Sequence, residues 1–113
     1  MTPPDLPLEL DVHAVQALRA AGTPFLLLDC RQPEEHATAS IPGAALVPMA
    51  EIPERLAELE RHRAGRIVVH CHHGGRSLRV AHWLRARGFD QAQSMAGGIE
   101  AWALEIDPGT PRY

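Results

Sequence analysis

The sequence predicts an α/β fold in which helices cover both faces of a parallel sheet. Two short runs, residues 25–29 and 67–69, place apolar residues at successive positions, as expected for strands that are buried on both faces. Segments with the apolar spacing of helices separate these and other short strands along the chain. Such alternation is typical of βαβ units, whose strands run parallel. In sheets of this kind, ligands bind beyond the carboxyl ends of the strands.

The first helix follows a proline-rich lead-in. Residues 1–7 are expected to form this loose lead-in, and residues 8–10 a short edge strand. Asp11 is a good N-cap for a helix over residues 12–21, because its side chain can accept a hydrogen bond from a free backbone N–H. Apolar residues at helical spacing give this helix one buried face: Val12, Val15, Leu18 and Ala21. Gly22 is expected to end the helix.

Between the two apolar runs, the sequence predicts a helical turn, a strand and a second helix. Pro33 suits the first turn of a helix, so residues 33–36 are expected to form one helical turn. Residues 44–47 are expected to form a short strand that ends at Pro48. Residues 52–60 are predicted to be a helix with a proline in its first turn.

The remaining elements follow the second apolar run. Ser77 is predicted to start a helix whose inner face carries Val80, Ala81 and Leu84. Gly88 is expected to cap its end. Residues 91–95 are expected to be a short strand and residues 99–104 a short helix. Residues 108–111, rich in proline and glycine, are expected to leave a frayed end.

Between the central strand and its helix lies the loop Cys71-His72-His73-Gly74-Gly75-Arg76. Glycines there let backbone N–H groups turn inward and converge, and the helix N-terminus adds partial positive charge. A thiol in that environment ionises more easily than a free thiol. The sequence therefore predicts that Cys71 is a nucleophile, and the alternative is an inert buried thiol.

Positive charge is concentrated in the segment that holds this loop. Residues 61–89 contain seven arginines and no acidic residue, although the whole chain has a net charge of −3. Local positive charge attracts small anions and favours a thiolate. Arg76 is therefore a candidate anion contact, or a brace that bonds a carboxylate, and the two roles are compatible. Four other arginines are more simply interpreted as solvated surface residues: Arg61, Arg63, Arg85 and Arg87.

The length and composition indicate one domain over residues 1–113, with a core at about residues 8–104 and short flexible ends. No apolar run is long enough to cross a bilayer, and no secretory signal opens the chain. Two cysteines without such a signal favour free thiols in a reducing compartment, so we expect a cytoplasmic protein. We expect neither a membrane nor a nucleic acid as a partner.

Four motifs together resemble the single-domain rhodanese family of sulfurtransferases. Residues 29–35, Asp-Cys-Arg-Gln-Pro-Glu-Glu, are similar to the family's entry motif, and residues 41–44, Ile-Pro-Gly-Ala, match its turn. Residues 71–77 are similar to its active-site loop, and residues 88–89 with 97–102 are similar to its closing segment. The four motifs occur in the family's order, and the resemblance runs from about residue 8 to residue 104, nearly the whole chain.

The resemblance implies a five-stranded parallel sheet in a three-layer α/β/α sandwich, and an enzyme of the thiosulfate sulfurtransferase type. Cys71 would carry the sulfur. The loop amides would bind the substrate or its sulfur, and they belong to His72, His73, Gly74, Gly75, Arg76 and Ser77. The strand that ends at Asp29 would lie beside the catalytic strand. Asp29 and Arg31 are thus candidates to support the loop, and the alternative is that they only cap local turns.

The expected chemistry runs through a persulfide. The Cys71 thiolate would attack the outer sulfur of a small anionic donor, either thiosulfate or another persulfide. Cyanide or a thiol would then remove that sulfur, with thioredoxin and glutathione as candidate thiol acceptors. Loop amides would stabilise the anionic outer sulfur, so no metal or organic cofactor is expected. His72 and His73 stand where some members that use thiosulfate have more strongly basic residues, which leaves the donor open.

Two other functions compete with this interpretation. The first is a persulfide relay or binding module that serves a dedicated partner enzyme. The second is a phosphatase or arsenate reductase. Four residues separate Cys71 from Arg76, whereas related phosphatases have one more, which makes room for a tetrahedral oxyanion. The shorter loop suits a single sulfur atom and favours sulfur transfer.

The histidines beside Cys71 and the second cysteine, Cys30, each have two interpretations. The run His70-Cys71-His72-His73 has ligand chemistry, but consecutive residues do not all point at one centre, so we predict no metal site. Cys30 is either a small apolar core residue or a thiol that approaches Cys71 and resolves its persulfide as a disulfide.

Overall fold

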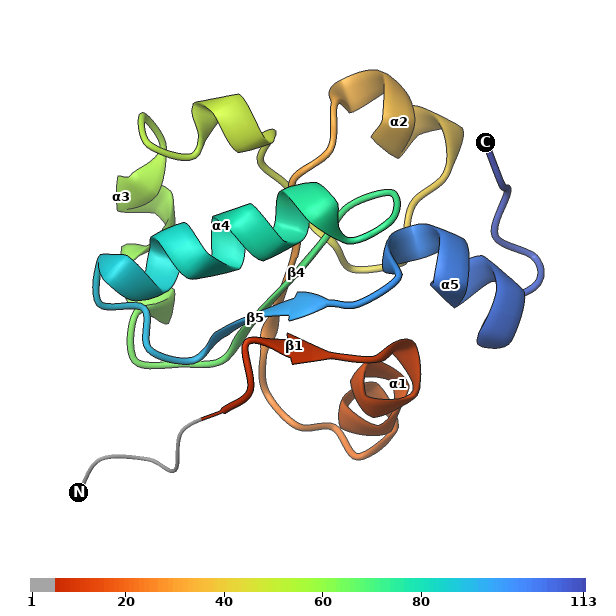
Figure 1. Ribbon diagram of the computed structural model, residues 1–113, viewed down its shortest axis with the longest axis horizontal. Helices are drawn as coiled ribbons and strands as arrows, with labels where there is room; N and C mark the ends of the chain where they lie inside the picture. Colours follow the sequence, from red (N-terminus) through yellow and green to blue (C-terminus); the bar gives the residue numbers. More distant parts are fainter. Residues whose placement is uncertain (1–5) are drawn as a thin grey trace.

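The computed structural model describes residues 6–113, in which five parallel strands form one sheet between helices (Figure 1). Residues 1–5 of the expected lead-in lie outside the described residues. The strands are β1 (Glu9–Leu10), β2 (Leu26–Asp29), β3 (Ala45–Leu46), β4 (Ile67–His70) and β5 (Ala92–Met95). Their spatial order is β1-β5-β4-β2-β3, and every pair is parallel. The predicted fold class, including the edge position of the first strand, is confirmed.

The helices form a layer on each side of the sheet (Figure 1). They are α1 (Val12–Ala20), α2 (Pro33–Thr38), α3 (Leu56–Leu59), α4 (Gly75–Ala86) and α5 (Gly98–Glu105), with 3₁₀ turns η1 (Met49–Glu51) and η2 (Glu60–His62). Helices α1 and α5 pack on one face, and α3 and α4 pack on the other. Asp11 caps α1 as predicted, since its Oδ1 accepts a 2.8 Å hydrogen bond from the Ala14 N–H.

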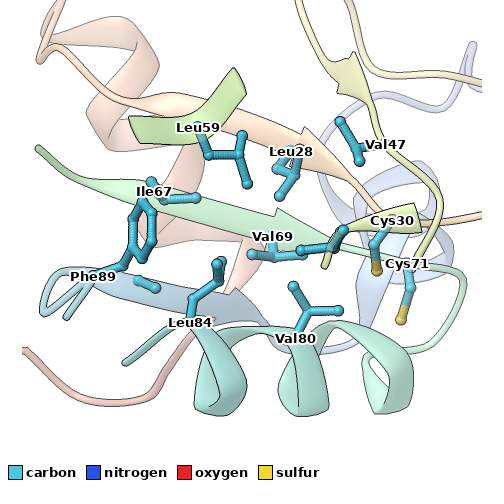
Figure 2. Close-up of a cluster of buried hydrophobic side chains, with 12 residues drawn as sticks. Leu28, Cys30, Val47, Leu59, Ile67, Val69, Cys71, Val80, Leu84 and Phe89 are labelled. Atoms are coloured by element: carbon cyan, nitrogen blue, oxygen red, sulfur yellow. The ribbon is translucent and has the colours of Figure 1, made fainter. Parts of the chain in front are cut away.

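Two apolar clusters hold the layers together, one on each face of the sheet. Successive residues of a strand point to opposite faces. Leu27 and Val68 therefore join the cluster under α1 and α5, whereas Leu28 and Val69 join the cluster under α3 and α4 (Figure 2). This two-sided burial explains why the strands are apolar at successive positions. Trp102 on α5 is also buried and belongs to the cluster under α1 and α5.

The prediction of one continuous helix over residues 52–60 is wrong. The chain instead forms η1, a run of turns and the four-residue helix α3, followed by η2. Pro53 has no N–H to continue the hydrogen bonds that begin in η1, so the helical ladder is interrupted. Arg55 then leaves the helical region, with φ −105° and ψ 15°. The apolar residues Ile52 and Leu59 are nevertheless buried.

The start of one helix also differs from the sequence prediction. Helix α4 begins at Gly75 rather than at Ser77, because Gly74 is the N-cap with φ +107°, a left-handed conformation that glycine adopts readily. The expected fraying of the C-terminal end stays a prediction, although the residues there make contacts. Thr110 is buried, and Tyr113 packs against the loop that contains Cys71. Among residues 6–113, no helix is both long and apolar enough to cross a bilayer.

Candidate active site

The Cys71 thiol lies at the carboxyl end of the sheet, one residue beyond β4. This is the edge where ligands bind in parallel sheets. The side chain is recessed, with 1% of the residue exposed. The loop that follows wraps around the sulfur and leads directly into α4. The position of the strand therefore fixes the thiol, and the first turn of α4 surrounds it.

Two backbone amides of the loop donate hydrogen bonds to the Cys71 sulfur. The Gly74 N–H lies 3.1 Å from Sγ and the Ser77 N–H lies 3.3 Å from it. The Ser77 hydroxyl is 3.4 Å from Sγ and 2.7 Å from the Ser94 hydroxyl on β5. The predicted ring of amides thus has two members in contact with the sulfur. Within residues 6–113, the amides of the other four predicted loop residues make no hydrogen bond to Sγ.

The N-terminus of α5 holds the opposite side of the loop. The Ile99 and Glu100 N–H groups donate to the carbonyl oxygens of Cys71 and His72, at 2.9 and 3.1 Å. Gly98 lies so close that a Cβ there would be 2.6 Å from the Cys71 carbonyl oxygen. Because the N–H and C=O of a trans peptide point in opposite directions, the N–H groups of His72 and His73 face away from α5.

The surroundings of Cys71 favour the thiolate. A hydrogen bond from the Cys30 thiol is the largest influence, and those from Ser77 and Gly74 add to it. Burial opposes them, yet the pKa of Cys71 falls from 9.0 to about 4. The thiolate is the reactive form of cysteine, so this site holds an activated nucleophile at neutral pH.

This pKa predicts an unusual pH dependence of alkylation. Because the thiolate persists until the pH approaches about 4, we expect the iodoacetamide rate constant at Cys71 to stay nearly constant from pH 8 to pH 5 and to fall below that. The measurement is the alkylation rate followed by peptide mass spectrometry. Free cysteine in the same tube is the control. A rate at Cys71 that tracked free cysteine would contradict the prediction.

Arg76 acts as a brace that bonds a carboxylate, one of its two expected roles. Its Nη1 and Nη2 donate to the two carboxylate oxygens of Glu35, at 2.6 and 2.9 Å. This bidentate pair lowers the pKa of Glu35 from 4.5 to about 2. Direct contact of Arg76 with a bound anion stays a prediction. Sequence reasoning expected a carboxylate partner but did not identify Glu35, because the partner lies 41 residues away on α2.

Asp29 and Arg31 form a buried ion pair beside the loop. Arg31 Nε and Nη2 donate to the two Asp29 oxygens at 2.9 and 2.7 Å, and both side chains are 0% exposed. Arg31 also donates to the Ala39 carbonyl, and the His36 ring bonds Asp29 at 2.8 Å. These contacts hold both ends of α2 in place, and α2 carries the carboxylate that Arg76 binds.

Tyr113 covers this corner of the site, and sequence reasoning missed it. Its ring stacks on His72 with the centroids 3.9 Å apart. Its hydroxyl accepts a hydrogen bond from Arg31 at 2.8 Å and donates one to Glu35 at 2.7 Å. No local pattern signals these hydrogen bonds, because about eighty residues of chain separate Tyr113 from Arg31 and Glu35.

The histidines of the loop do not converge with the thiol on one centre. His70 is fully buried, and neither ring nitrogen has a hydrogen-bond partner within the described residues. His72, His73 and Glu100 do bring possible ligand atoms within 4.8 Å of one another, but Arg112 forms an ion pair with Glu100 at 2.5 Å. The absence of a metal from the site stays a prediction.

Comparison with known proteins identifies a family and several relatives that are similar to this chain. A family model described as a rhodanese-like domain matches residues 11–105. A sulfurtransferase of Allochromatium vinosum is 35% identical over 95 residues, which cover 84% of this chain and 87% of that protein. Several other curated relatives are much longer. The chain spans 30% of the rhodanese-like/PpiC domain-containing protein 12 of Arabidopsis thaliana, and 20–21% of two Zea mays adenylyltransferase and sulfurtransferase proteins.

Solved structures share the arrangement of strands and helices. A rhodanese-like domain protein from Staphylococcus aureus superposes with a TM-score of 0.78 at 28% identity, covering 93% of this chain and 97% of that one. A thiosulfate sulfurtransferase from Pseudomonas aeruginosa also has a TM-score of 0.78, at 31% identity, covering 92% of this chain and 20% of that one.

Proposed function

The chain belongs to the rhodanese-like family, and from this premise we propose that it is a sulfurtransferase that carries sulfur as a persulfide on Cys71. One observation carries the proposal. The Cys71 sulfur accepts hydrogen bonds from the amides of Gly74 and Ser77, in a loop in which four residues separate Cys71 from Arg76. Such amides stabilise negative charge on sulfur without a metal.

The first half-reaction would load one sulfur atom. The Cys71 thiolate attacks the outer sulfur of thiosulfate, the S–S bond of thiosulfate breaks, and sulfite leaves with the bonding electrons. The product is a Cys71 persulfide whose negative charge lies on the outer sulfur. In the second half-reaction, cyanide attacks that outer sulfur, thiocyanate leaves, and the Cys71 thiolate is restored. A thiol acceptor would follow the same route.

The position of Arg76 favours sulfur transfer over phosphate chemistry. A phosphatase needs donors that hold the oxygens of a tetrahedral oxyanion, and arginine usually supplies two of them. Here both terminal nitrogens of Arg76 bind Glu35. The guanidinium therefore braces the loop from outside, and the space near Sγ is bounded by backbone amides. This arrangement suits the transfer of a single atom.

A persulfide relay to a partner enzyme is the second candidate function. The recessed position of Cys71, 1% exposed beneath a loop that also contacts Tyr113, favours small or specifically docked donors. The relatives named as adenylyltransferase and sulfurtransferase combine a matched segment of this kind with a longer chain. In a relay, loading would resemble that of an enzyme, but turnover with free cyanide would be slow.

Rapid mixing with thiosulfate tests the proposed function. We expect one equivalent of sulfite per protein within the first turnover, followed by steady production of thiocyanate when cyanide is present. A sulfite burst with almost no thiocyanate would favour the relay. Glutathione persulfide serves as an alternative donor in a parallel reaction. If neither donor transfers sulfur to the protein, the proposed function is wrong.

A further inference from the structure

The structure places a second thiol directly beside Cys71. Strands β2 and β4 pair in parallel with Asp29 opposite His70, so Cys30 and Cys71 occupy the next positions of the same register. The Cys30 N–H donates to the His70 carbonyl at 3.1 Å, which continues the pairing past the strand ends. Both side chains belong to the apolar cluster under α3 and α4, and Figure 2 shows their sulfur atoms at the same end of it.

The backbone geometry at this position suits a disulfide. Neighbouring strands lie about 4.8 Å apart, and the Cα atoms of a disulfide are typically about 4.4–6.8 Å apart. Cys30 and Cys71 project from the same face of the sheet at the same register position, which places a disulfide between them within this range. The two thiols also influence each other electrostatically, because Cys71 raises the pKa of Cys30 and Cys30 lowers that of Cys71.

We propose that Cys30 is a resolving thiol that discharges the Cys71 persulfide as hydrogen sulfide when no acceptor is present. This inference rests on the proposed function, because the persulfide is its starting point. Both cysteine residues are buried, 0% and 1% exposed, and they follow adjacent strands at the same register position.

The step balances without an external oxidant. The Cys30 sulfur attacks Sγ of Cys71, a bond forms between the two cysteine sulfurs, and the bond from Sγ to the outer sulfur breaks. The outer sulfur leaves with the bonding electrons and takes the Cys30 proton, so hydrosulfide is released. The sulfane sulfur is reduced to sulfide, and the two cysteine sulfurs are oxidised to a disulfide. A dithiol reductant restores both thiols by exchange.

This reaction would leave the protein in an inactive, oxidised form. A Cys30–Cys71 disulfide has no nucleophile, so sulfur loading ends until a dithiol reduces it. In the unloaded protein Cys71 and burial raise the pKa of Cys30, and burial persists once Cys71 carries the persulfide, so Cys30 stays a protonated and poor nucleophile. We therefore expect resolution to be slow beside transfer to a good acceptor. Cys30 would discharge the persulfide only when no acceptor removes its outer sulfur first.

The test compares the wild-type chain with Cys30→Ser and Cys30→Val. Each protein is loaded with thiosulfate, freed of excess donor, and followed by intact mass and a sulfide assay without an acceptor. We expect the wild-type adduct, one sulfur heavier, to convert into a species two hydrogens lighter than the reduced protein while one equivalent of sulfide appears. In both variants the adduct should last at least about tenfold longer. The serine variant keeps a hydrogen-bond donor, and the valine variant keeps the apolar packing.

Peptide mapping without reductant locates the new bond. Trypsin separates Cys30 and Cys71 into residues 20–31 and 67–76, which should run as one linked species after resolution. A wild-type adduct as long-lived as that of the variants, with no linked peptide, would overturn the inference and leave the proposed function standing. If none of the three proteins gains a sulfur, the proposed function fails and this inference fails with it.

Discussion

Replacing Cys71 by serine is expected to abolish sulfur transfer, lowering kcat for thiocyanate formation by at least about 1000-fold. A serine hydroxyl stays protonated where the thiol ionises, and its oxygen forms no persulfide. The amides of Gly74 and Ser77 would remain in place, but they would have no sulfur to hold. The measurement is the steady-state rate with thiosulfate and cyanide, together with the sulfite burst.

The matched control for this variant is His82→Ser, on the exposed side of α4. This substitution also introduces a serine, but it lies on the exposed side of α4 and does not contact the thiol, so kcat should change less than about twofold. Far-UV circular dichroism of Cys71→Ser should match that of the wild type. If Cys71→Ser kept more than about a tenth of the wild-type rate, the nucleophile would have to be another group.

Removal of the Asp29 carboxylate has the largest expected effect on stability. In Asp29→Asn, the Arg31 guanidinium stays fully buried without its counter-charge, and breaking a buried pair from one side costs about 3–5 kcal/mol. Helix α2 should loosen as well, because Arg31 and His36 meet at this carboxylate. The free energy of unfolding in urea measures the loss. Arg76 would then be held less firmly through Glu35, so the sulfite burst should also slow.

Two comparisons separate the buried pair from general effects of charge. Glu105→Gln removes the exposed pair with His13 and should leave the unfolding midpoint nearly unchanged. The double variant Asp29→Leu/Arg31→Met removes both buried charges and should be more stable than Asp29→Asn. An Asp29→Asn variant that lost less than about 1 kcal/mol would show that Arg31 does not depend on this carboxylate.

The same ion pair predicts a pH dependence of stability. Burial by itself raises the pKa of Asp29, but the Arg31 hydrogen bonds, with smaller help from His70 and His36, lower it below 3.8. A lowered pKa in the folded state stabilises the protein fully above the unfolded value, and this stabilisation is lost as the pH falls through the folded value. Below about pH 4, the free energy of unfolding should therefore fall less steeply with decreasing pH in Asp29→Asn than in the wild type.

The sheet could be predicted from the sequence because its signal is local. Buried strands such as β2 and β4 place apolar residues at successive positions, and the residues that end each strand follow directly in the chain. The segment from η1 to α3 was harder, because its apolar residues have helical spacing while Pro53 interrupts the hydrogen bonds. In this segment the apolar spacing indicates which residues are buried, but it does not indicate the backbone conformation.

The candidate site was predictable where it is made from one stretch of chain. Residues 71–77 contain the thiol, both amides that contact it and the arginine that braces the loop. The partners from elsewhere could not be assigned, because Glu35 and Tyr113 reach the loop only after the sheet and α2 are in place. The contact between Cys30 and Cys71 likewise depends on the register of β2 against β4, which sequence spacing does not fix.

The location of the transferred sulfur tests the central claim most directly. Thiosulfate-treated protein is quenched in acid and digested with trypsin, and peptides 20–31 and 67–76 are weighed without reductant. We predict one additional sulfur on residues 67–76, the peptide that contains Cys71, immediately after loading. Sulfur carried on residues 20–31 instead, or on neither peptide while thiocyanate is still produced, would contradict a persulfide at Cys71.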